Sequence, residues 1–190
     1  FNQPYKITPA RFSVWMRVLA RVPQSVLWLA SEDGVVQTRL RHCADEHGID
    51  PARLIFARRE PQQADHLARL ALADLFLDTA PYTAHATACD ALWAGLPLLT
   101  CTGASFPARV STSLLMHLGL SALVTETVAA YEARAVQLAT QPTVLADLRN
   151  QLARCRHTSP VFDAMTMARQ LEQAYRAMQA RRVAGLPPIS

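Results

Sequence analysis

One stretch of this sequence, residues 78–90, carries side chains suited to binding a phosphate group. His85, Ala86 and Thr87 stand where a helix is expected to begin, so their backbone N–H groups and the positive end of the helix dipole can receive an anion. The Thr87 hydroxyl and the His85 ring add donors, and the Asp90 carboxylate can accept hydrogen bonds from ribose hydroxyls. The same spacing also fits a helix start that Thr87 caps and Asp90 stabilises, and taken alone it favours that structural interpretation.

Three further side chains have types that suit a nucleotide. Lys6 is the only lysine among 19 basic residues. Its flexible point charge suits a diphosphate, although a single lysine is also compatible with an ordinary exposed surface residue. His66 and Arg69 share one helix face at i and i+3, where they could flank a base, contact a phosphate or simply be exposed.

Several common catalytic and cofactor motifs are absent from the sequence. No two of the six glycines lie close enough for a G-x-G-x-x-G turn or a phosphate-binding P-loop. The sequence also lacks the H-E-x-x-H, G-x-S-x-G and C-x-x-C patterns. We therefore expect neither a metal ion nor a cofactor.

The elements that must position these residues alternate along the chain. Short apolar runs predict strands at 25–30, 54–57, 75–79, 97–101 and 122–125. A helix is predicted before them at 9–22, further helices between them at 35–47, 61–72, 86–93 and 108–119, and others after them at 127–139, 142–156 and 163–182. This order predicts an α/β fold with a doubly wound, Rossmann-like parallel sheet covered on both faces. In such sheets ligands bind at the carboxyl ends of the strands, where the loops after Phe56 and Asp78 and the loop 103–107 should converge.

Composition agrees with one globular unit. The 190 residues are 51% hydrophobic and 18% charged, which suits a single domain with a sizeable core. The net charge of +4 is dispersed over arginines without interleaved aromatics, so we expect a solvated surface and no nucleic-acid partner. No stretch approaches the ~18 apolar residues of a membrane span. The four separated cysteines fit reduced thiols in a cytoplasmic protein.

Several sequence blocks resemble the O-GlcNAc transferase family, the UDP-GlcNAc:polypeptide N-acetylglucosaminyltransferases and their Spindly-type relatives. These blocks are F-N-Q-P-Y-K-I at 1–7, R-V-P-Q-S-V-L-W-L at 21–29, R-L-I-F at 53–56, L-D-T at 77–79, H-x-T-x-x-D-x-L-W-A-G at 85–95 and S-P-x-F at 159–162. The resemblance implies the C-terminal half of a GT-B glycosyltransferase, and we expect a bacterial homologue. Residues 1–160 would form the nucleotide-sugar domain, and residues 161–190 a helix that packs back on an N-terminal catalytic half.

The resemblance also assigns roles to individual residues. Gln3 and Lys6 would face the diphosphate, with Lys6 catalytic, while the helix start at His85, Ala86 and Thr87 would cradle it and Asp90 would hold the ribose. The positions that match the base and ribose contacts are Glu60, Gln62, His66 and Arg69. This sequence departs from the family in having Gln62 in place of a lysine, one extra residue between Pro61 and His66, and Ala86 where threonine is common.

The function implied is inverting, metal-independent transfer of N-acetylglucosamine from UDP-GlcNAc to Ser/Thr hydroxyls of proteins. The leaving diphosphate would be stabilised by preorganised donors, without a cofactor. The acceptor would bind mostly to the N-terminal half and to TPR repeats outside this chain, with no membrane or nucleic-acid partner. Alternatives are a Spindly-type protein O-fucosyltransferase using GDP-fucose, a non-catalytic nucleotide-sugar-binding module and a purely structural domain.

Overall fold

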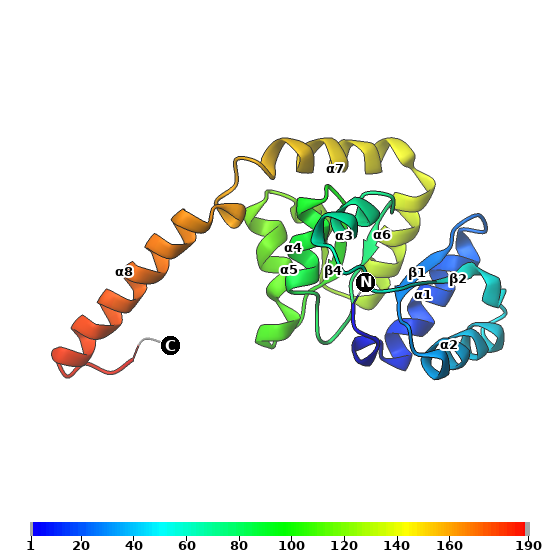
Figure 1. The fold of residues 1–190 in the computed structure, drawn as a ribbon, viewed down its shortest axis with the longest axis horizontal. Coiled ribbons are helices and arrows are strands. Elements are labelled where there is room, and N and C mark those ends of the chain that lie inside the picture. Colours follow the sequence, from blue (N-terminus) through cyan, green and yellow to red (C-terminus); the bar gives the residue numbers. More distant parts are fainter. Residues whose placement is uncertain (1, 189–190) are drawn as a thin grey trace.

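A computed structural model describes residues 2–188 of the chain (Figure 1). Its strands are β1 (Leu27–Ala30), β2 (Leu54–Ala57), β3 (Phe76–Leu77), β4 (Leu98–Cys101) and β5 (Val124–Thr125). Its α-helices are α1 (Pro9–Arg21), α2 (Gly34–Glu46), α3 (Gln63–Leu70), α4 (Ala86–Trp93), α5 (Val110–His117), α6 (Val128–Thr140), α7 (Pro142–Cys155) and α8 (Ala164–Val183). Short 3-10 helices include η1 (Pro4–Lys6), η3 (Phe106–Ala108) and η5 (Pro160–Phe162). Phe1, the first residue of the F-N-Q-P-Y-K-I block, lies outside the described residues, as do the last two residues of the expected C-terminal segment.

The strands confirm the predicted α/β class but not a continuous sheet. β1 pairs with β2, and β4 lies between β3 and β5, with every pairing parallel. Within residues 2–188 no backbone pairing joins these two parts, so the single sheet that the sequence predicts is observed as two. β3 and β5 have two residues each, fewer than predicted. For β3 the difference is partly one of boundaries, because Asp78 still donates its N–H to the Leu99 carbonyl at 3.0 Å.

Helices cover β4, the most buried strand, from two sides. All four β4 residues are buried. α4 and α5 pack on this strand, and α6 packs on it as well and also contacts α1 (Figure 1). The predicted start of α4 at Ala86 and the Thr8–Pro9 start of α1 are confirmed. The third predicted helix begins at Gln63, two residues after Pro61.

A hydrogen-bonded chain through the core ties α1 to the end of β3. The Trp15 indole N–H donates to the Tyr131 hydroxyl at 3.2 Å, and that hydroxyl donates to the Asp78 carbonyl at 3.1 Å. Tyr131 is fully buried and the Arg11 guanidinium lies 4.2 Å from the centre of its ring. Burial of these aromatic groups with satisfied polar ends fixes α1 and α6 against the strand that leads into the candidate site.

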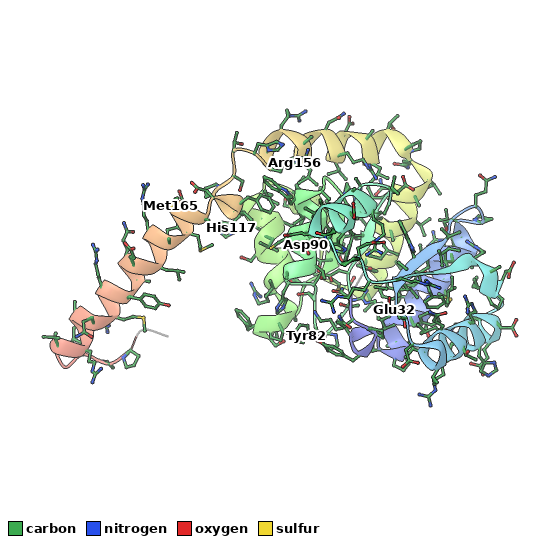
Figure 2. The ribbon with its side chains drawn as sticks, in the orientation of Figure 1. Glu32, Tyr82, Asp90, His117, Arg156 and Met165 are labelled. Carbon is green, nitrogen blue, oxygen red and sulfur yellow. The ribbon has the colours of Figure 1, made fainter. Side chains whose placement is uncertain are left out.

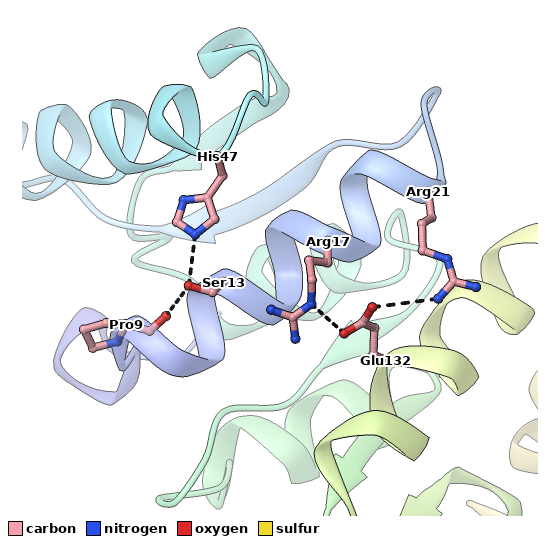
Figure 3. A network of polar contacts seen from close by, with 6 residues as sticks. All are labelled: Pro9, Ser13, Arg17, Arg21, His47 and Glu132. Carbon is pink, nitrogen blue, oxygen red and sulfur yellow. Dashed lines mark hydrogen bonds and ion pairs between the residues drawn. The ribbon is translucent and has the colours of Figure 1, made fainter.

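Polar contacts on the outer side hold α1 between α2 and α6 (Figure 3). Glu132 of α6 lies 2.8 Å from Arg17 Nε and 3.8 Å from Arg21 Nη1. His47 Nε2, just after α2, lies 3.0 Å from the Ser13 hydroxyl, which donates to the Pro9 carbonyl. These exposed contacts contribute little energy individually, but they fix the orientation of α1.

α8 extends away from the rest of the molecule (Figure 1). None of its described residues is buried, and Figure 2 shows Met165 near its start, well apart from Asp90 on α4. The preceding η5 still contacts the domain, because the Phe162 ring lies 5.3 Å from that of Trp93. The chain therefore leaves the domain at about Asp163, whose carboxylate caps α8 by accepting hydrogen bonds from the N–H groups of Met165 and Thr166.

Candidate functional site

The Lys6 ammonium lies beside the loop that leads into α4. Its Nζ donates to the Thr83 carbonyl at 3.1 Å and lies 4.1 Å from the centre of the Tyr82 ring. Partial burial lowers the pKa of Lys6, and the nearby Asp78 carboxylate acts in the opposite direction. An ammonium carries three N–H groups, so the contact with Thr83 leaves it able to donate to a ligand as well.

The start of α4 is open in the way that an anion site requires. His85 occupies the position before the first turn, and no side chain caps that turn, whereas Thr8 and Asp33 cap α1 and α2. The His85 ring stacks on Tyr82, with ring centres 4.8 Å apart. Tyr82 thus contacts both the Lys6 ammonium and the His85 ring, and so joins Lys6 to the helix start. Figure 2 shows Tyr82 on this loop and Asp90 on α4.

A buried carboxylate organises the loop between β3 and α4. Asp78 has no exposed surface. Its Oδ1 accepts hydrogen bonds from the N–H groups of Thr79 at 2.8 Å and Ala84 at 2.7 Å, and its Oδ2 accepts one from the Thr100 hydroxyl at 2.7 Å. Burial raises the pKa of Asp78, and these hydrogen bonds act against that rise. The carboxylate closes the loop on itself and places both Tyr82 and Thr83.

Asn2 connects the amino-terminal segment to this loop and to α4. Its side-chain N–H donates to the Thr79 hydroxyl at 2.8 Å, and its side-chain oxygen accepts from the Thr87 hydroxyl at 2.8 Å. In this structure the Thr87 hydroxyl, expected to face a ligand, therefore donates to Asn2. The backbone N–H groups at the start of α4 are the remaining means by which this turn can bind an anion.

Four of the expected base and ribose residues form one chain of contacts across α3 and α4. Arg69 lies 3.3 Å from Glu60 and donates to His66 Nδ1 at 3.1 Å, while His66 Nε2 lies 3.7 Å from Asp90. Because arginine only donates, His66 Nδ1 accepts and its proton lies on Nε2, facing Asp90. The contact with His66 thus orients the Asp90 carboxylate.

The other expected site residues lie at the edges of this region. Gln3 is exposed, and its carbonyl accepts from the Lys6 N–H at 3.0 Å. Gln62 is exposed immediately before α3, and Ala86 is exposed in the first turn of α4. In residues 2–188, no three His, Cys, Asp or Glu side chains lie close enough to hold a metal ion together. Across the same residues, no helix combines the length and hydrophobicity of a membrane span.

Sequence reasoning gave no role to Asn2, Asp78, Thr79 or Tyr82. One signal could have indicated Asp78 and Thr79: a carboxylate and a hydroxyl directly follow an apolar strand, where the ligand sites of α/β folds lie. Nothing in the sequence pairs Asn2 with Thr87, because 85 positions separate them.

Comparisons with known proteins agree over almost the whole chain. A family model described as glycosyl transferase family 41 matches residues 1–171. A UDP-N-acetylglucosamine–peptide N-acetylglucosaminyltransferase of Caenorhabditis elegans is 35% identical over 187 residues, which cover 98% of this chain and 16% of the relative. A protein of Arabidopsis thaliana described as probably having the same activity, SEC, is 35% identical over 189 residues, covering 99% of this chain and 19% of the relative.

A solved structure supports the same relationship. A mutant O-GlcNAc transferase of Thermobaculum terrenum superposes with a TM-score of 0.88 and 34% identity, over 97% of this chain and 36% of the other. These matches confirm the resemblance and the α/β fold drawn from the sequence. The chain spans less than a fifth of the two curated relatives described above.

Proposed function

Because the chain belongs to glycosyl transferase family 41, we propose that it forms the donor-binding half of an enzyme that transfers N-acetylglucosamine from UDP-GlcNAc to proteins. The observation that carries this proposal is the position of the Lys6 ammonium beside the uncapped start of α4, joined to it through Tyr82. A cation close to a helix start with free N–H groups suits a diphosphate.

In the proposed reaction a Ser or Thr hydroxyl oxygen attacks the anomeric carbon of the sugar. The bond from that carbon to the β-phosphate oxygen breaks, and its electron pair goes to the phosphate, while a base outside the described site takes the hydroxyl proton. Attack opposite the leaving group inverts the anomeric centre. The negative charge that develops on the β-phosphate is stabilised by Lys6, by the N–H groups of Ala86 and Thr87, and by Gln3. We propose that these donors act without a metal ion.

The nucleoside lies, in this proposal, toward α3. Asp90 holds the ribose hydroxyls, and His66, Arg69, Glu60 and Gln62 flank the base and ribose. The contact of His66 with Asp90, supported by Arg69 and Glu60, keeps Asp90 oriented, which lowers the entropy lost on binding. The acceptor protein binds mainly to the N-terminal half and TPR repeats of the complete cytoplasmic enzyme.

The direct test is a thermal-shift comparison of the full-length protein with UDP, GDP, UDP-GlcNAc and GDP-fucose. The proposal predicts stabilisation by the two uridine ligands, because a ligand that binds the folded state raises the melting temperature. Stabilisation by GDP and GDP-fucose alone would instead assign the protein to fucosyl transfer. Uridine binding without sugar transfer to any protein would make it a binding module.

Replacing Asp90 should weaken nucleotide binding more than it slows the chemical step. Asp90→Ala removes the acceptor for the ribose hydroxyls, and hydrogen bonds to a charged group suggest a loss of about 10- to 100-fold in UDP affinity. Calorimetry on the full-length protein measures the change, with Asp147→Ala on the exposed side of α7 as the matched control. An unchanged UDP affinity in Asp90→Ala would remove Asp90 from the site.

We further propose that α8 packs against the N-terminal catalytic half. Met167, Leu171, Tyr175 and Met178 follow helical spacing along one face, and all are exposed here. Gln173 lies on the opposite, polar face. An apolar stripe of this kind is typical of a helix that is buried in a larger assembly.

Leu171→Asp should therefore destabilise the full-length protein, whereas Gln173→Asp should not. Burial of one leucine is worth about 1.5–3 kcal/mol, which corresponds to a melting temperature lower by a few degrees in a protein longer than this chain. Thermal unfolding of both variants measures this difference. Equal melting temperatures for the two variants would show that the stripe stays in solvent.

A further inference from the structure

The carboxyl ends of β1 and β2 border a polar pocket beside the candidate site. Its volume is about 490 Å³, and it is lined by Glu32, Gln37, Arg41, Phe56 and Arg58. We propose that this Arg41–Arg58 pocket binds an acidic side chain of the acceptor polypeptide, near the Ser or Thr residue that receives the sugar. The inference rests on the transfer function proposed above and adds to it a preferred class of acceptor.

The local fold places both arginines at the pocket. Arg58 directly follows β2, and Arg41 lies on α2, where its guanidinium is 4.8 Å from the centre of the Phe56 ring. Gln37, one turn earlier on α2, donates at 2.9 Å to the carbonyl of Ser31, which directly follows β1. This hydrogen bond holds the start of α2 against the end of β1, and the stacking on Phe56 orients the Arg41 guanidinium.

The pocket has an excess of positive charge. Arg41 and Arg58 are exposed, and within residues 2–188 neither forms an ion pair. Among the residues that the structure describes, Glu32 is the only carboxylate that lines the pocket, and its Oε1 accepts a hydrogen bond from the Arg59 N–H at 3.0 Å. Two guanidinium groups and one carboxylate favour an anionic ligand, and a carboxylate matches the paired N–H groups of arginine.

The position of the pocket favours the acceptor as the source of this anion. The Arg58 carbonyl accepts a hydrogen bond from Arg69, one of the residues proposed to flank the base and ribose. The pocket therefore adjoins the nucleoside residues but consists of other, mostly exposed side chains. Figure 2 shows Glu32 of the pocket and Tyr82 of the candidate site toward the same, lower side of the molecule. A polypeptide whose hydroxyl reaches the sugar extends past the nucleotide, so its flanking side chains can contact this surface.

Binding of two peptides to the full-length protein in the presence of UDP tests the proposal. Both peptides are labelled with fluorescein and carry a serine, which is flanked by glutamates in one peptide and by glutamines in the other. Fluorescence anisotropy measures both affinities. We expect the glutamate peptide to bind about three- to tenfold more tightly, the effect of two exposed ion pairs. Because salt screens exposed charges, higher ionic strength should bring the two affinities closer together.

Variants of the pocket assign this preference to its residues. R41Q/R58Q should reduce the ratio of the two affinities to less than about twofold, whereas R39Q, an exposed position of α2 outside the pocket, should leave the ratio unchanged. E32Q should increase the ratio, because its amide oxygen still accepts from the Arg59 N–H while the negative charge is lost. R58Q alone should lower the ratio by about half, and this exposed substitution keeps the test valid if the double variant does not fold.

Equal affinities of the natural protein for the two peptides, or an unchanged ratio in R58Q and R41Q/R58Q, would overturn the proposal. A loss of UDP affinity of about tenfold or more in R58Q would also overturn it, because the pocket would then belong to the nucleotide site. A melting temperature lowered by more than about 4 °C in R58Q would assign the arginines to an ion pair elsewhere in the full-length protein, with the same consequence. None of these measurements requires sugar transfer, so failure of the proposed function would be seen separately, as the absence of transfer by the natural protein.

Discussion

Lys6→Ala in the full-length enzyme is expected to lower kcat by about 10²- to 10³-fold, the usual effect of removing one donor to a developing oxyanion. The ammonium lies beside the start of α4 and contacts Tyr82 and Thr83, so its charge would act on the leaving β-phosphate. UDP affinity should fall by less than about tenfold, because the helix N–H groups and Asp90 still bind the ground state. Steady-state kinetics and calorimetry on the same variant separate the two effects.

Two matched variants sharpen this prediction. Arg39→Ala removes an exposed cation of α2 and should leave both kcat and UDP affinity unchanged. Lys6→Arg keeps the charge but spreads it over a larger planar group, so its kcat should lie between those of Lys6→Ala and the natural enzyme. Near-normal turnover by Lys6→Ala would refute the catalytic role of Lys6.

Asp78→Ala is expected to cause the largest loss of stability. The carboxylate is fully buried, and its removal leaves the N–H groups of Thr79 and Ala84 and the Thr100 hydroxyl without their acceptor. Buried donors without partners cost about 1–3 kcal/mol each, so the melting temperature should fall by several degrees. Thermal unfolding of the full-length protein measures this change.

The conservative variant Asp78→Asn should lose less than half as much stability as Asp78→Ala. Its amide oxygen can take the place of Oδ1, which accepts both backbone N–H groups, and its N–H can donate to the Thr100 oxygen once that hydroxyl rotates. Asp74→Asn serves as the control. The Asp74 carboxylate is 92% exposed, so this variant should leave the melting temperature unchanged. Similar melting temperatures for Asp78→Ala and Asp74→Asn would mean that the loop is held by other contacts.

Local signals in the sequence predicted much of the fold. The Thr8–Pro9 helix start, the apolar runs of β1, β2 and β4 and the helix beginning at Ala86 follow from capping and periodicity within a few residues. The continuous sheet could not be predicted correctly, because apolar runs identify strands without showing which of their edges are paired. Likewise, the spacing of α8 shows an apolar face but not what covers it.

The candidate site was predicted only in part. The spacing of His85, Thr87 and Asp90 and the resemblance indicated the start of α4 and Lys6, and the structure places these groups close to one another. The supporting contacts among Asn2, Asp78 and Thr100 were missed, since each joins residues at least 22 positions apart. Local patterns carry no information about such pairs. These pairs form only when folding brings β3, β4 and the amino-terminal segment together.

A crystal structure of the full-length protein with UDP tests the central claim most directly. We expect oxygens of the diphosphate within about 3.2 Å of the Lys6 ammonium and of the backbone N–H groups of Ala86 and Thr87, with the ribose hydroxyls on Asp90. A diphosphate bound elsewhere, with Lys6 still occupied only by Thr83 and Tyr82, would contradict the account.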